Sequence, residues 1–353
     1  MSTTMRTTKT SLTRRAAAAA VALGSCLALA SPATGAGAAA PADPVPTVFF
    51  GDSYTANYGI APHNLDEQKR AFCFQSKENY PAVATRSLAE KGITLTTQAD
   101  VSCGGALAHH FWTEHETFPV SGSSDFTVAA QQEALKPDTE LVVGSMGGNT
   151  AGFVNILKQC SDKLRSGEHG LLPGAPVDAD QPAATCAEFF TSGDGKEWLG
   201  YRIEQAGEHL EELLDRAGYF APDAQRVLVG YPRLVPADTT KCMTAAPGET
   251  ELPFADVPAD ALPVLDQVQR RLNDVMKMAV ADAETNAAFV DLYSVTGANT
   301  ACDGADRGIG GLLETSQAEL FGTKLPWYAH PNIKGRDLQA QHVATTIEAV
   351  LNR

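Results

Sequence analysis

The chain has 353 residues, of which 44% are hydrophobic and 20% are charged. This composition supplies enough apolar side chains for a sizeable core and excludes a largely disordered protein. The formal net charge at pH 7 is -15. A surface this acidic repels phosphate backbones and anionic lipid headgroups, so nucleic acid is not an expected partner.

The N-terminal segment has the three-part layout of a secretory signal. Arg14 and Arg15 precede an apolar run over residues 16–30, and small residues follow over 31–40. The run is too short to span a bilayer comfortably. Cleavage within the small-residue stretch predicts that residues 1–38 are a signal peptide and that the chain is secreted.

The remaining residues, 39–353, are expected to form a single domain with no membrane span, because no other stretch approaches the ~20 apolar residues of a membrane helix. Two alternatives to simple secretion stay open. Arg14 and Arg15 also fit a twin-arginine signal, and residues 23–26 resemble a bacterial lipobox, which would leave Cys26 lipidated.

Short apolar runs alternate with amphipathic segments along the rest of the chain. Runs rich in β-branched and aromatic residues predict strands, and apolar residues at helical spacing predict helices. In chain order we expect strand 47–50, helix 79–91, strand 94–101, helix 127–135, strand 140–144, helix 151–160, helix 196–217, strand 226–229, helix 264–279, strand 288–292 and helix 338–351. This alternation predicts an α/β fold with a central five-stranded parallel sheet covered on both faces.

Two Gly- and Pro-rich segments, 161–195 and 233–260, are expected as loop excursions from this domain. Apart from Cys26, the chain has an even number of cysteines, which in an exported protein predicts disulfides. Several pairings are open, and we expect sequential pairing because each bridge then closes one local loop. The expected pairs are Cys73–Cys103, Cys160–Cys186 and Cys242–Cys302.

Three reactive side chains stand where the chain is expected to reach one edge of the sheet. Ser53 follows the first strand in the tripeptide Gly51-Asp52-Ser53, Asn149 follows the third strand after two glycines, and His330 precedes the last helix. In a parallel α/β sheet, reactive groups collect beyond the carboxyl ends of the strands. We therefore expect Ser53, Asn149 and His330 to meet at one site.

This set of residues suits attack on an ester carbonyl. A serine is a weak nucleophile until a base removes its proton, and the imidazole of His330 titrates near neutral pH. The oxyanion formed by the attack requires preorganised donors. Candidates are the Ser53 N–H, the Asn149 side chain and a backbone N–H from the loop 103–105 after the second strand, where glycine lets the backbone approach a ligand closely. Asp52 is expected to hold the nucleophile loop.

The ordered motifs resemble those of the SGNH, or GDSL-type, hydrolases, and especially the secreted actinobacterial esterases and lipases. The likeness runs from about residue 47 to residue 351 and implies a flavodoxin-like three-layer α/β/α fold. It also implies Ser53 as nucleophile, His330 as general base, and Ser53, Gly105 and Asn149 around the oxyanion, with no metal or organic cofactor. The motifs that carry the likeness are Gly51-Asp52-Ser53, Gly105, Gly148-Asn149 and His330.

The chain departs from the family pattern at three positions. Tyr54 stands where the family has leucine, a change expected to alter only local packing. Thr150 replaces the aspartate that usually follows the asparagine, so the resemblance does not establish how Asn149 is supported. Trp327 occupies the place, three residues before His330, where the family usually has an aspartate.

No carboxylate stands at position 327, and the chain resembles those secreted actinobacterial members of the family that use a backbone carbonyl there instead. This resemblance implies a Ser53–His330 dyad in which the Trp327 backbone carbonyl accepts the Nδ1 hydrogen of the imidazole. A carbonyl fixes the tautomer without a full negative charge, so it stabilises the imidazolium less than an aspartate does. The alternative is a carboxylate from elsewhere in the chain. Its candidates are Asp303, Asp306 and Asp337.

The sequence therefore predicts a secreted carboxylic ester hydrolase, an esterase or lipase, that forms an acyl-enzyme on Ser53 and acts as a monomer on a small-molecule or lipid ester. The first alternative is an O-acetylesterase or an envelope-lipid acyl esterase. A second, from another class, is a non-catalytic binding module on the same fold.

One ligand-rich cluster lies outside these motifs: His109, His110, Glu114 and His115. Its spacing matches no standard zinc motif, so we expect a solvated loop near the mouth of the site and no metal. The intervening pair 111–112, a phenylalanine and a tryptophan, suits either an acyl groove or a cover over the core.

Overall fold

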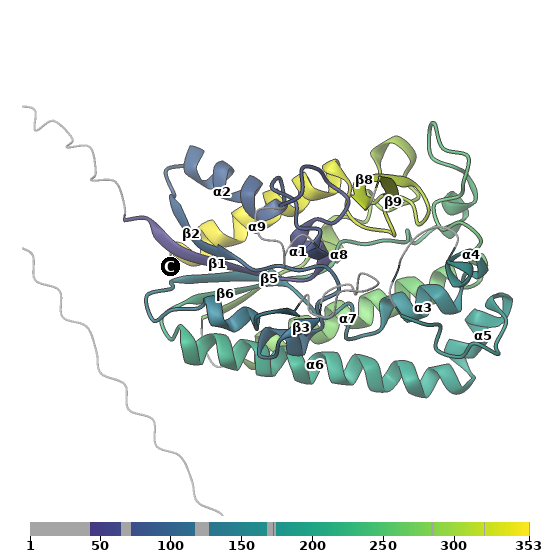
Figure 1. Ribbon diagram of the computed structural model, residues 1–353, viewed down its shortest axis with the longest axis horizontal. Helices are drawn as coiled ribbons and strands as arrows, with labels where there is room; N and C mark the ends of the chain where they lie inside the picture. The colour runs from purple at the N-terminus through teal and green to yellow at the C-terminus, as the bar shows by residue number, and fades with distance from the viewer. Residues whose placement is uncertain are drawn as a thin grey trace, which may run out of the picture. The chain divides into compact units, whose positions relative to one another are not determined.

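The apolar runs of the sequence form one parallel sheet in the computed structural model (Figure 1). The structure describes residues 43–64, 72–116, 127–167, 172, 174–283, 286–320 and 322–352. The strands are β1 (Val45–Gly51), β2 (Leu95–Asp100), β5 (Leu141–Ser145), β6 (Gln225–Val229) and β7 (Ala287–Val290), and they lie side by side in the order β2-β1-β5-β6-β7. The expected α/β class with a five-stranded parallel sheet is confirmed.

Helices cover both faces of this sheet (Figure 1), which is why its central strands are apolar without alternation. On one face, α2 (Tyr80–Glu90) and α9 (Ile333–Leu351) pack against side chains such as Phe49 and Val143. On the other face, α6 (Asp194–Phe220) and α7 (Leu262–Asp282) pack against the alternate side chains of the same strands, such as Phe50 and Val142, which point to the opposite side of the sheet. The three-layer arrangement follows from these two cores.

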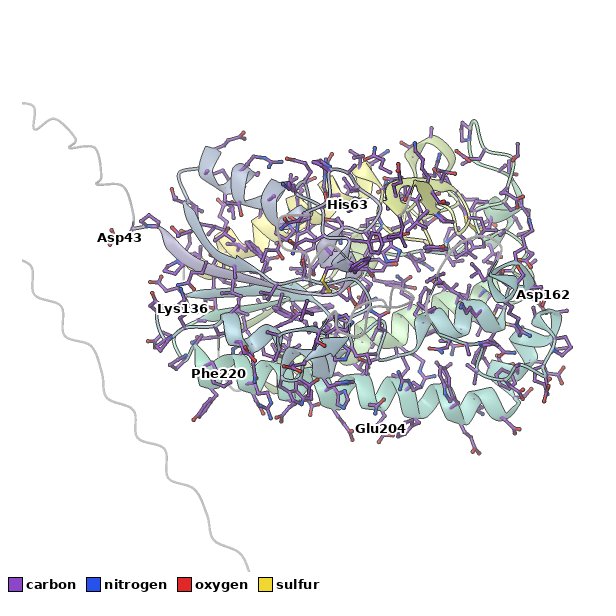
Figure 2. The ribbon with its side chains drawn as sticks, viewed as in Figure 1. Asp43, His63, Lys136, Asp162, Glu204 and Phe220 are labelled. Carbon is purple, nitrogen blue, oxygen red and sulfur yellow. A yellow bond between two sulfur atoms is a disulfide. The ribbon has the colours of Figure 1, made fainter. Side chains whose placement is uncertain are left out.

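The solvent-facing side of helix α6 is polar, as expected of an amphipathic helix. Glu204 extends outward from α6 (Figure 2), while Leu210 and Leu213 of the same helix are fully buried. No helix in the described ranges is long and apolar enough to cross a membrane. The segment predicted as a signal peptide, residues 1–38 with Cys26, lies outside the described residues.

The expectation of a helix over 127–135 is wrong. Its β-branched start forms β4 (Thr127–Val128), which pairs antiparallel with β3 (His115–Glu116), and a single 3₁₀ turn, η3 (Gln131–Ala134), follows. Pro137 closes the segment after a few residues, so there is no length over which helical spacing could be extended. The side chain of Gln131 is instead used for a contact with β1.

Several other boundaries differ from expectation, and short elements occur that the sequence did not suggest. Helix α9 begins five residues before position 338 because Asn332 caps it, its Oδ1 accepting the Gly335 N–H at 3.1 Å. The remaining elements are α1 (Ser53–Ala56), η2 (Ala108–Phe111), α3 (Phe153–Gln159), α4 (Asp162–Ser166), η4 (Ala183–Thr185), α5 (Cys186–Thr191), η5 (Thr239–Met243), α8 (Leu292–Val295), η6 (Gly304–Asp306), β8 (Thr315–Leu320) and β9 (Thr323–Pro326).

These short elements occupy the regions expected as excursions. Segment 161–195 holds α4, η4, α5 and the first two residues of α6, and segment 233–260 holds η5. The cysteines pair as Cys73–Cys103, Cys160–Cys186 and Cys242–Cys302, in sequence order. All described residues belong to one compact unit of the chain, Pro41–Arg353.

Candidate functional site

Ser53 lies on a tight turn between β1 and the short helix α1. Gly51 ends the strand with φ +139°, and a Cβ at this position would lie 2.2 Å from Thr55 Oγ1 and 2.6 Å from the Ser145 carbonyl oxygen. Only glycine fits this turn. Asp52 then caps α1, its Oδ1 accepting the Tyr54 N–H at 2.9 Å. Ser53 is thereby presented beyond the carboxyl end of the strand.

His330 lies directly beside this serine. Its Nε2 is 2.7 Å from Ser53 Oγ, although 277 residues separate the two in sequence. Its Nδ1 is 2.9 Å from the Trp327 carbonyl oxygen and 3.1 Å from that of Tyr328. Because a carbonyl only accepts, Nδ1 carries the hydrogen and Nε2 is free to accept the Ser53 hydroxyl hydrogen.

The three aspartates considered as alternatives to a backbone carbonyl have other partners. Asp303 binds Lys241, Asp306 binds Lys334 and Asp337 binds Arg336. Each of these salt bridges is held at 2.7 Å. The two backbone carbonyls are the partners of His330 Nδ1 within the described residues.

Burial of the imidazole lowers the pKa of His330 from its ordinary value of 6.5 to about 4. The hydrogen bonds from Nδ1 to the Trp327 and Tyr328 carbonyls act in the opposite direction because they stabilise the charged ring. Desolvation outweighs them, so His330 is neutral at pH 7. A neutral imidazole with a free Nε2 is the form that a general base requires.

Three potential hydrogen-bond donors surround the Ser53 hydroxyl. In the described part of the chain, neither the Ser53 N–H nor the Gly105 N–H has an acceptor. Gly105 has φ +81°, a conformation that favours glycine. Asn149 donates one amide hydrogen to the Ala106 carbonyl oxygen at 3.0 Å, which fixes the side chain and leaves its second hydrogen available.

Four of the five predicted site residues line a single cavity of about 610 Å³, and Trp327, predicted to act through its backbone carbonyl, is not among the lining residues. Ser53 enters it from the end of β1, Gly105 from the loop after β2, Asn149 from the loop after β5 and His330 from the segment before α9. The structure therefore brings together the residues that the sequence placed at separate strand ends.

Comparisons with known proteins identify the family of this chain. The model of the GDSL-like lipase/acylhydrolase family matches residues 49–338. The chain belongs to this family. An esterase from Streptomyces scabiei is 70% identical over 354 residues, with 100% of both chains covered. This GDSL-type chain is accordingly an enzyme, and membership supports carboxylic ester hydrolysis.

Two solved structures share the fold. Phospholipase A1 from Streptomyces albidoflavus NA297 superposes with a TM-score of 0.55 at 17% identity, over 87% of this chain and 99% of that one. An extracellular lipase from Streptomyces rimosus gives a TM-score of 0.56 at 18% identity, again over 87% and 99%. At this identity the likeness concerns the fold alone.

Tyr54, which stands where the GDSL pattern has leucine, does more than alter local packing, so the expectation of a packing change alone is wrong. Its hydroxyl donates to the Ala329 carbonyl oxygen at 2.8 Å, immediately before His330, and its ring lies 4.8 Å from the imidazole. A leucine could supply neither the hydrogen bond nor the aromatic contact. Tyr54 thus connects the nucleophile turn to the segment that carries the base.

Thr150, which stands in place of the family aspartate, supports a neighbouring loop. Its buried hydroxyl accepts the Ala108 N–H at 2.7 Å. Asn149 itself is held from other directions, by Ala106 at its side chain and by Arg202 Nη2 at its carbonyl oxygen, 3.3 Å away. The side-chain and carbonyl contacts of Asn149 are therefore to Ala106 and Arg202, while the Thr150 hydroxyl binds Ala108.

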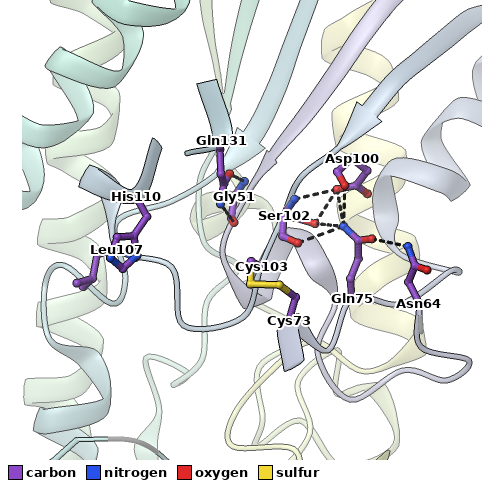
Figure 3. Close-up of a disulfide and its surroundings, with 10 residues drawn as sticks. All are labelled: Gly51, Asn64, Cys73, Gln75, Asp100, Ser102, Cys103, Leu107, His110 and Gln131. Carbon is purple, nitrogen blue, oxygen red and sulfur yellow. Dashed lines mark hydrogen bonds between the residues drawn. A yellow bond between two sulfur atoms is a disulfide. The ribbon is translucent and has the colours of Figure 1, made fainter. Parts of the chain in front are cut away.

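The loop that carries Gly105 is anchored by a disulfide and by the side chain of Gln75 (Figure 3). The Cys73–Cys103 disulfide joins it to the segment after residue 71, and the Gly104 N–H donates to the Cys73 carbonyl oxygen at 2.9 Å. The amide of Gln75 lies 3.0 Å from Ser102 Oγ and 2.9 Å from an oxygen of Asp100. These contacts hold the stretch of chain directly before Gly105.

Sequence reasoning missed Gln131, which forms a paired contact with the backbone of Gly51 (Figure 3). Its Oε1 accepts the Gly51 N–H at 2.7 Å and its Nε2 donates to the Gly51 carbonyl oxygen at 2.9 Å. The contact spans 80 residues of sequence, and a glutamine outside any motif gives no signal of it. Tyr231 was also missed, although it follows β6 at the same sheet edge as the other site residues.

The histidine cluster lies at the wall of the cavity. His110 and His115 line it and stack with ring centroids 4.3 Å apart, and His110 Nδ1 accepts the Leu107 N–H at 3.0 Å. Burial lowers the pKa of His110 to about 3 and that of His115 to about 4, so both rings are neutral. No group of three or more His, Cys, Asp or Glu side chains in the described ranges is arranged to hold a metal ion. Phe111 is fully buried against Phe50, so it covers the core.

Proposed function

We propose that this GDSL-family enzyme is a secreted serine hydrolase that cleaves carboxylic esters through an acyl-enzyme on Ser53. The observation that carries the proposal is the 2.7 Å contact between Ser53 Oγ and His330 Nε2. Both side chains line one cavity together with Gly105, whose N–H has no acceptor among the described residues. The proposed enzyme acts as a monomer.

In the proposed reaction, His330 Nε2 accepts the hydroxyl proton as Ser53 Oγ bonds to the ester carbonyl carbon. The negative charge that develops on the carbonyl oxygen is stabilised by the N–H groups of Ser53 and Gly105 and by the free amide hydrogen of Asn149. His330 returns the proton to the leaving alkoxide as the ester C–O bond breaks. A water molecule then repeats the sequence and releases the acid.

The backbone carbonyls of Trp327 and Tyr328 take the orienting role in this proposed dyad. They hold Nδ1–H and thereby keep Nε2 aimed at Ser53. They add no full charge to stabilise the imidazolium that forms in the transition state. The enzyme then depends more heavily on the oxyanion donors for stabilisation of the transition state.

The cavity favours acyl chains longer than acetyl. Its volume of about 610 Å³ is much larger than an acetyl group needs, and apolar side chains dominate the walls beyond the nucleophile. These walls include Phe74, Leu107, Phe153, Leu157, Leu272 and Leu325. We therefore place acyl esters of medium or long chain ahead of O-acetyl esters as substrates.

The decisive test replaces Ser53 by alanine. We expect Ser53→Ala to abolish hydrolysis of p-nitrophenyl esters and labelling by a fluorophosphonate probe, while circular dichroism stays unchanged. Retained turnover would reject Ser53 as the nucleophile. A wild-type chain that the probe does not label would instead favour the non-catalytic binding module.

A chain-length series tests the substrate class. We expect p-nitrophenyl octanoate and palmitate to be hydrolysed with higher kcat/KM than the acetate. Val154→Trp, which adds bulk to a half-buried position of the cavity wall, should lower kcat/KM for long chains and spare the acetate. A preference for acetate in the unaltered enzyme would support the O-acetylesterase alternative.

A further inference from the structure

A tyrosine that the proposed mechanism does not use lies behind the nucleophile and the oxyanion donors. Tyr231 follows β6 at the carboxyl edge of the sheet and is buried. Its hydroxyl donates to Asp52 Oδ2 and accepts the Gly148 N–H at 2.7 Å. A single oxygen atom thus bridges two loops that leave neighbouring strands.

The residues at the two ends of this bridge each precede a residue of the proposed site. Asp52 precedes Ser53, and Gly148 precedes Asn149. The ladder between β1 and β5 ends at the pair Gly51 and Ser145, and one further backbone hydrogen bond runs from the Asp52 N–H to the Ser145 carbonyl oxygen at 3.0 Å. This backbone pairing stops before Gly148. The Tyr231 hydroxyl supplies a connection beyond the point where the ladder stops.

Packing makes this connection stiff. The Tyr231 N–H donates to Asn273 Oδ1 of α7 at 2.8 Å, which holds the tyrosine from its own backbone. Its ring meets that of Tyr54 edge to face at 4.8 Å. A Cβ added at Gly148 would lie 3.1 Å from both Cζ and the hydroxyl of Tyr231, so the loop backbone rests directly on the ring.

The groups in this bridge are costly to leave unpaired. Asp52 is buried, and burial raises its pKa from 3.8 to about 7, while the hydrogen bond from Tyr231 opposes the rise because it stabilises the carboxylate. Loss of the hydroxyl would leave Asp52 Oδ2 and the Gly148 N–H without these partners. The Gly148 loop would then have to shift to find another acceptor.

We propose that Tyr231 is a positioning residue, which fixes the side chain of Asn149 relative to Ser53 through Gly148 and Asp52. The inference rests on the proposed function, because the role of Asn149 as an oxyanion donor belongs to that proposal. Tyr231 acts on the stabilisation of the transition state and not on binding of the ground state. Its removal should therefore change kcat far more than KM.

The test is a double-mutant cycle on the full chain, assayed with p-nitrophenyl octanoate. We expect Tyr231→Phe to lower kcat about 10- to 100-fold with little change in KM, which is less than the roughly 10²- to 10³-fold loss typical when an oxyanion donor is removed. In the Asn149→Ala background, the same substitution should have almost no further effect, because the side chain that Tyr231 positions is gone.

Tyr293→Phe is the matched control. Tyr293 also donates its hydroxyl to a carboxylate, Asp266 at 2.8 Å, but it does not line the cavity. We expect its kcat to equal that of the unaltered enzyme. If circular dichroism shows that Tyr231→Phe is unfolded, Gly148→Ala replaces it in the cycle. The new methyl group displaces the same loop and leaves the Tyr231 hydroxyl in place.

Two results would overturn the inference. One is that Tyr231→Phe lowers kcat by the same factor with and without the Asn149 side chain. The other is that Tyr231→Phe leaves kcat unchanged. Failure of the proposed function has a different signature, which is Asn149→Ala or Ser53→Ala with undiminished kcat. The two failures are therefore distinguishable in one set of variants.

Discussion

The catalytic base of the proposed dyad is oriented by a turn of main chain. Tyr328 and Ala329 both have positive φ, +50° and +60°, which is uncommon for residues other than glycine. This conformation directs the carbonyls of Trp327 and Tyr328 at the same Nδ1. Such strain persists only where surrounding contacts hold it, and the hydrogen bond from Tyr54 to Ala329 is one of them.

The pH profile of activity is expected to reflect the buried base. Because the pKa of His330 is about 4, the ring is neutral and competent above that value and becomes protonated as the pH falls through it. The acid limb of kcat/KM should therefore have its midpoint near pH 4, well below the ordinary 6.5.

The profile would be measured with p-nitrophenyl octanoate from pH 3 to pH 8. Enzyme incubated at the lowest pH and assayed again at pH 7 controls for unfolding. Asp52, whose pKa is raised to about 7, titrates in the same range as an ordinary histidine. A midpoint near 6.5 that persists in Asp52→Asn would therefore show that the His330 ring is solvated in the free enzyme.

Trp327 is expected to matter for stability more than for chemistry, because its contribution to the dyad is a backbone atom. The indole is buried against Gly59 and Gly310 and does not line the cavity. Trp327→Ala should lower the free energy of unfolding by about 3–5 kcal/mol, measured by urea titration. The kcat of the folded variant should stay close to that of the unaltered enzyme.

Trp327→Phe provides the conservative comparison, with a smaller loss of stability and the same kcat. A large fall of kcat in folded Trp327→Ala would mean that the indole itself shapes the turn that carries His330.

At the scale of elements, the loop after β2 has little secondary structure and is held by a disulfide and by side-chain hydrogen bonds. It carries Gly105 between a disulfide and the 3₁₀ turn η2, in which Ala108 is bound to Thr150. We infer that the disulfide replaces the support that a longer helix or strand would give.

Removal of this disulfide should therefore lower activity. We expect the double variant Cys73→Ser with Cys103→Ser to have a reduced kcat, because the Gly105 N–H loses its fixed position. The measurement is kcat and KM for p-nitrophenyl octanoate at a temperature where the variant is folded.

The matched control removes a different bridge, Cys242–Cys302, which lies away from the cavity lining. Both double variants are expected to lose about 2–5 kcal/mol of stability. Only the first should lose kcat, so unchanged kinetics there would show that the bridge serves stability alone.

On the scale of the whole molecule, the site is assembled at one edge of the sheet. Ser53, Gly105, Asn149 and Tyr231 each follow the carboxyl end of a different strand, and His330 arrives from the segment before α9. A doubly covered parallel sheet leaves its strand ends as the place where loops from distant sequence can meet. The convergence of the site is thus a property of the topology.

Export is the prediction that belongs to the complete chain. We expect protein recovered from the culture medium of an actinobacterial expression host to begin at residue 39, as measured by mass spectrometry of the intact protein. A mature chain that begins at Cys26, carries a lipid mass and partitions with membranes would support the lipoprotein alternative. Replacement of Arg14 and Arg15 by lysine separates the twin-arginine route from the general one, since only the former requires the arginine pair.

The sequence by itself determined the features that depend on neighbouring residues. Apolar periodicity located the five strands and the long helices, and turn glycines marked the ends at which Ser53 and Asn149 stand. These signals are local, because strand and helix patterns repeat every two or 3.6 residues. The same reasoning failed at 127–135, where a pattern of nine residues was too short to separate a helix from a strand and a turn.

Only the tertiary structure decided which distant groups meet. The carbonyls that hold His330, the pairing of Gln131 with Gly51 and the bridge from Tyr231 to Asp52 all depend on how the layers pack. The last of these contacts spans 179 residues. No local pattern encodes such a contact, since its geometry arises from the positions of whole strands and helices around a shared core.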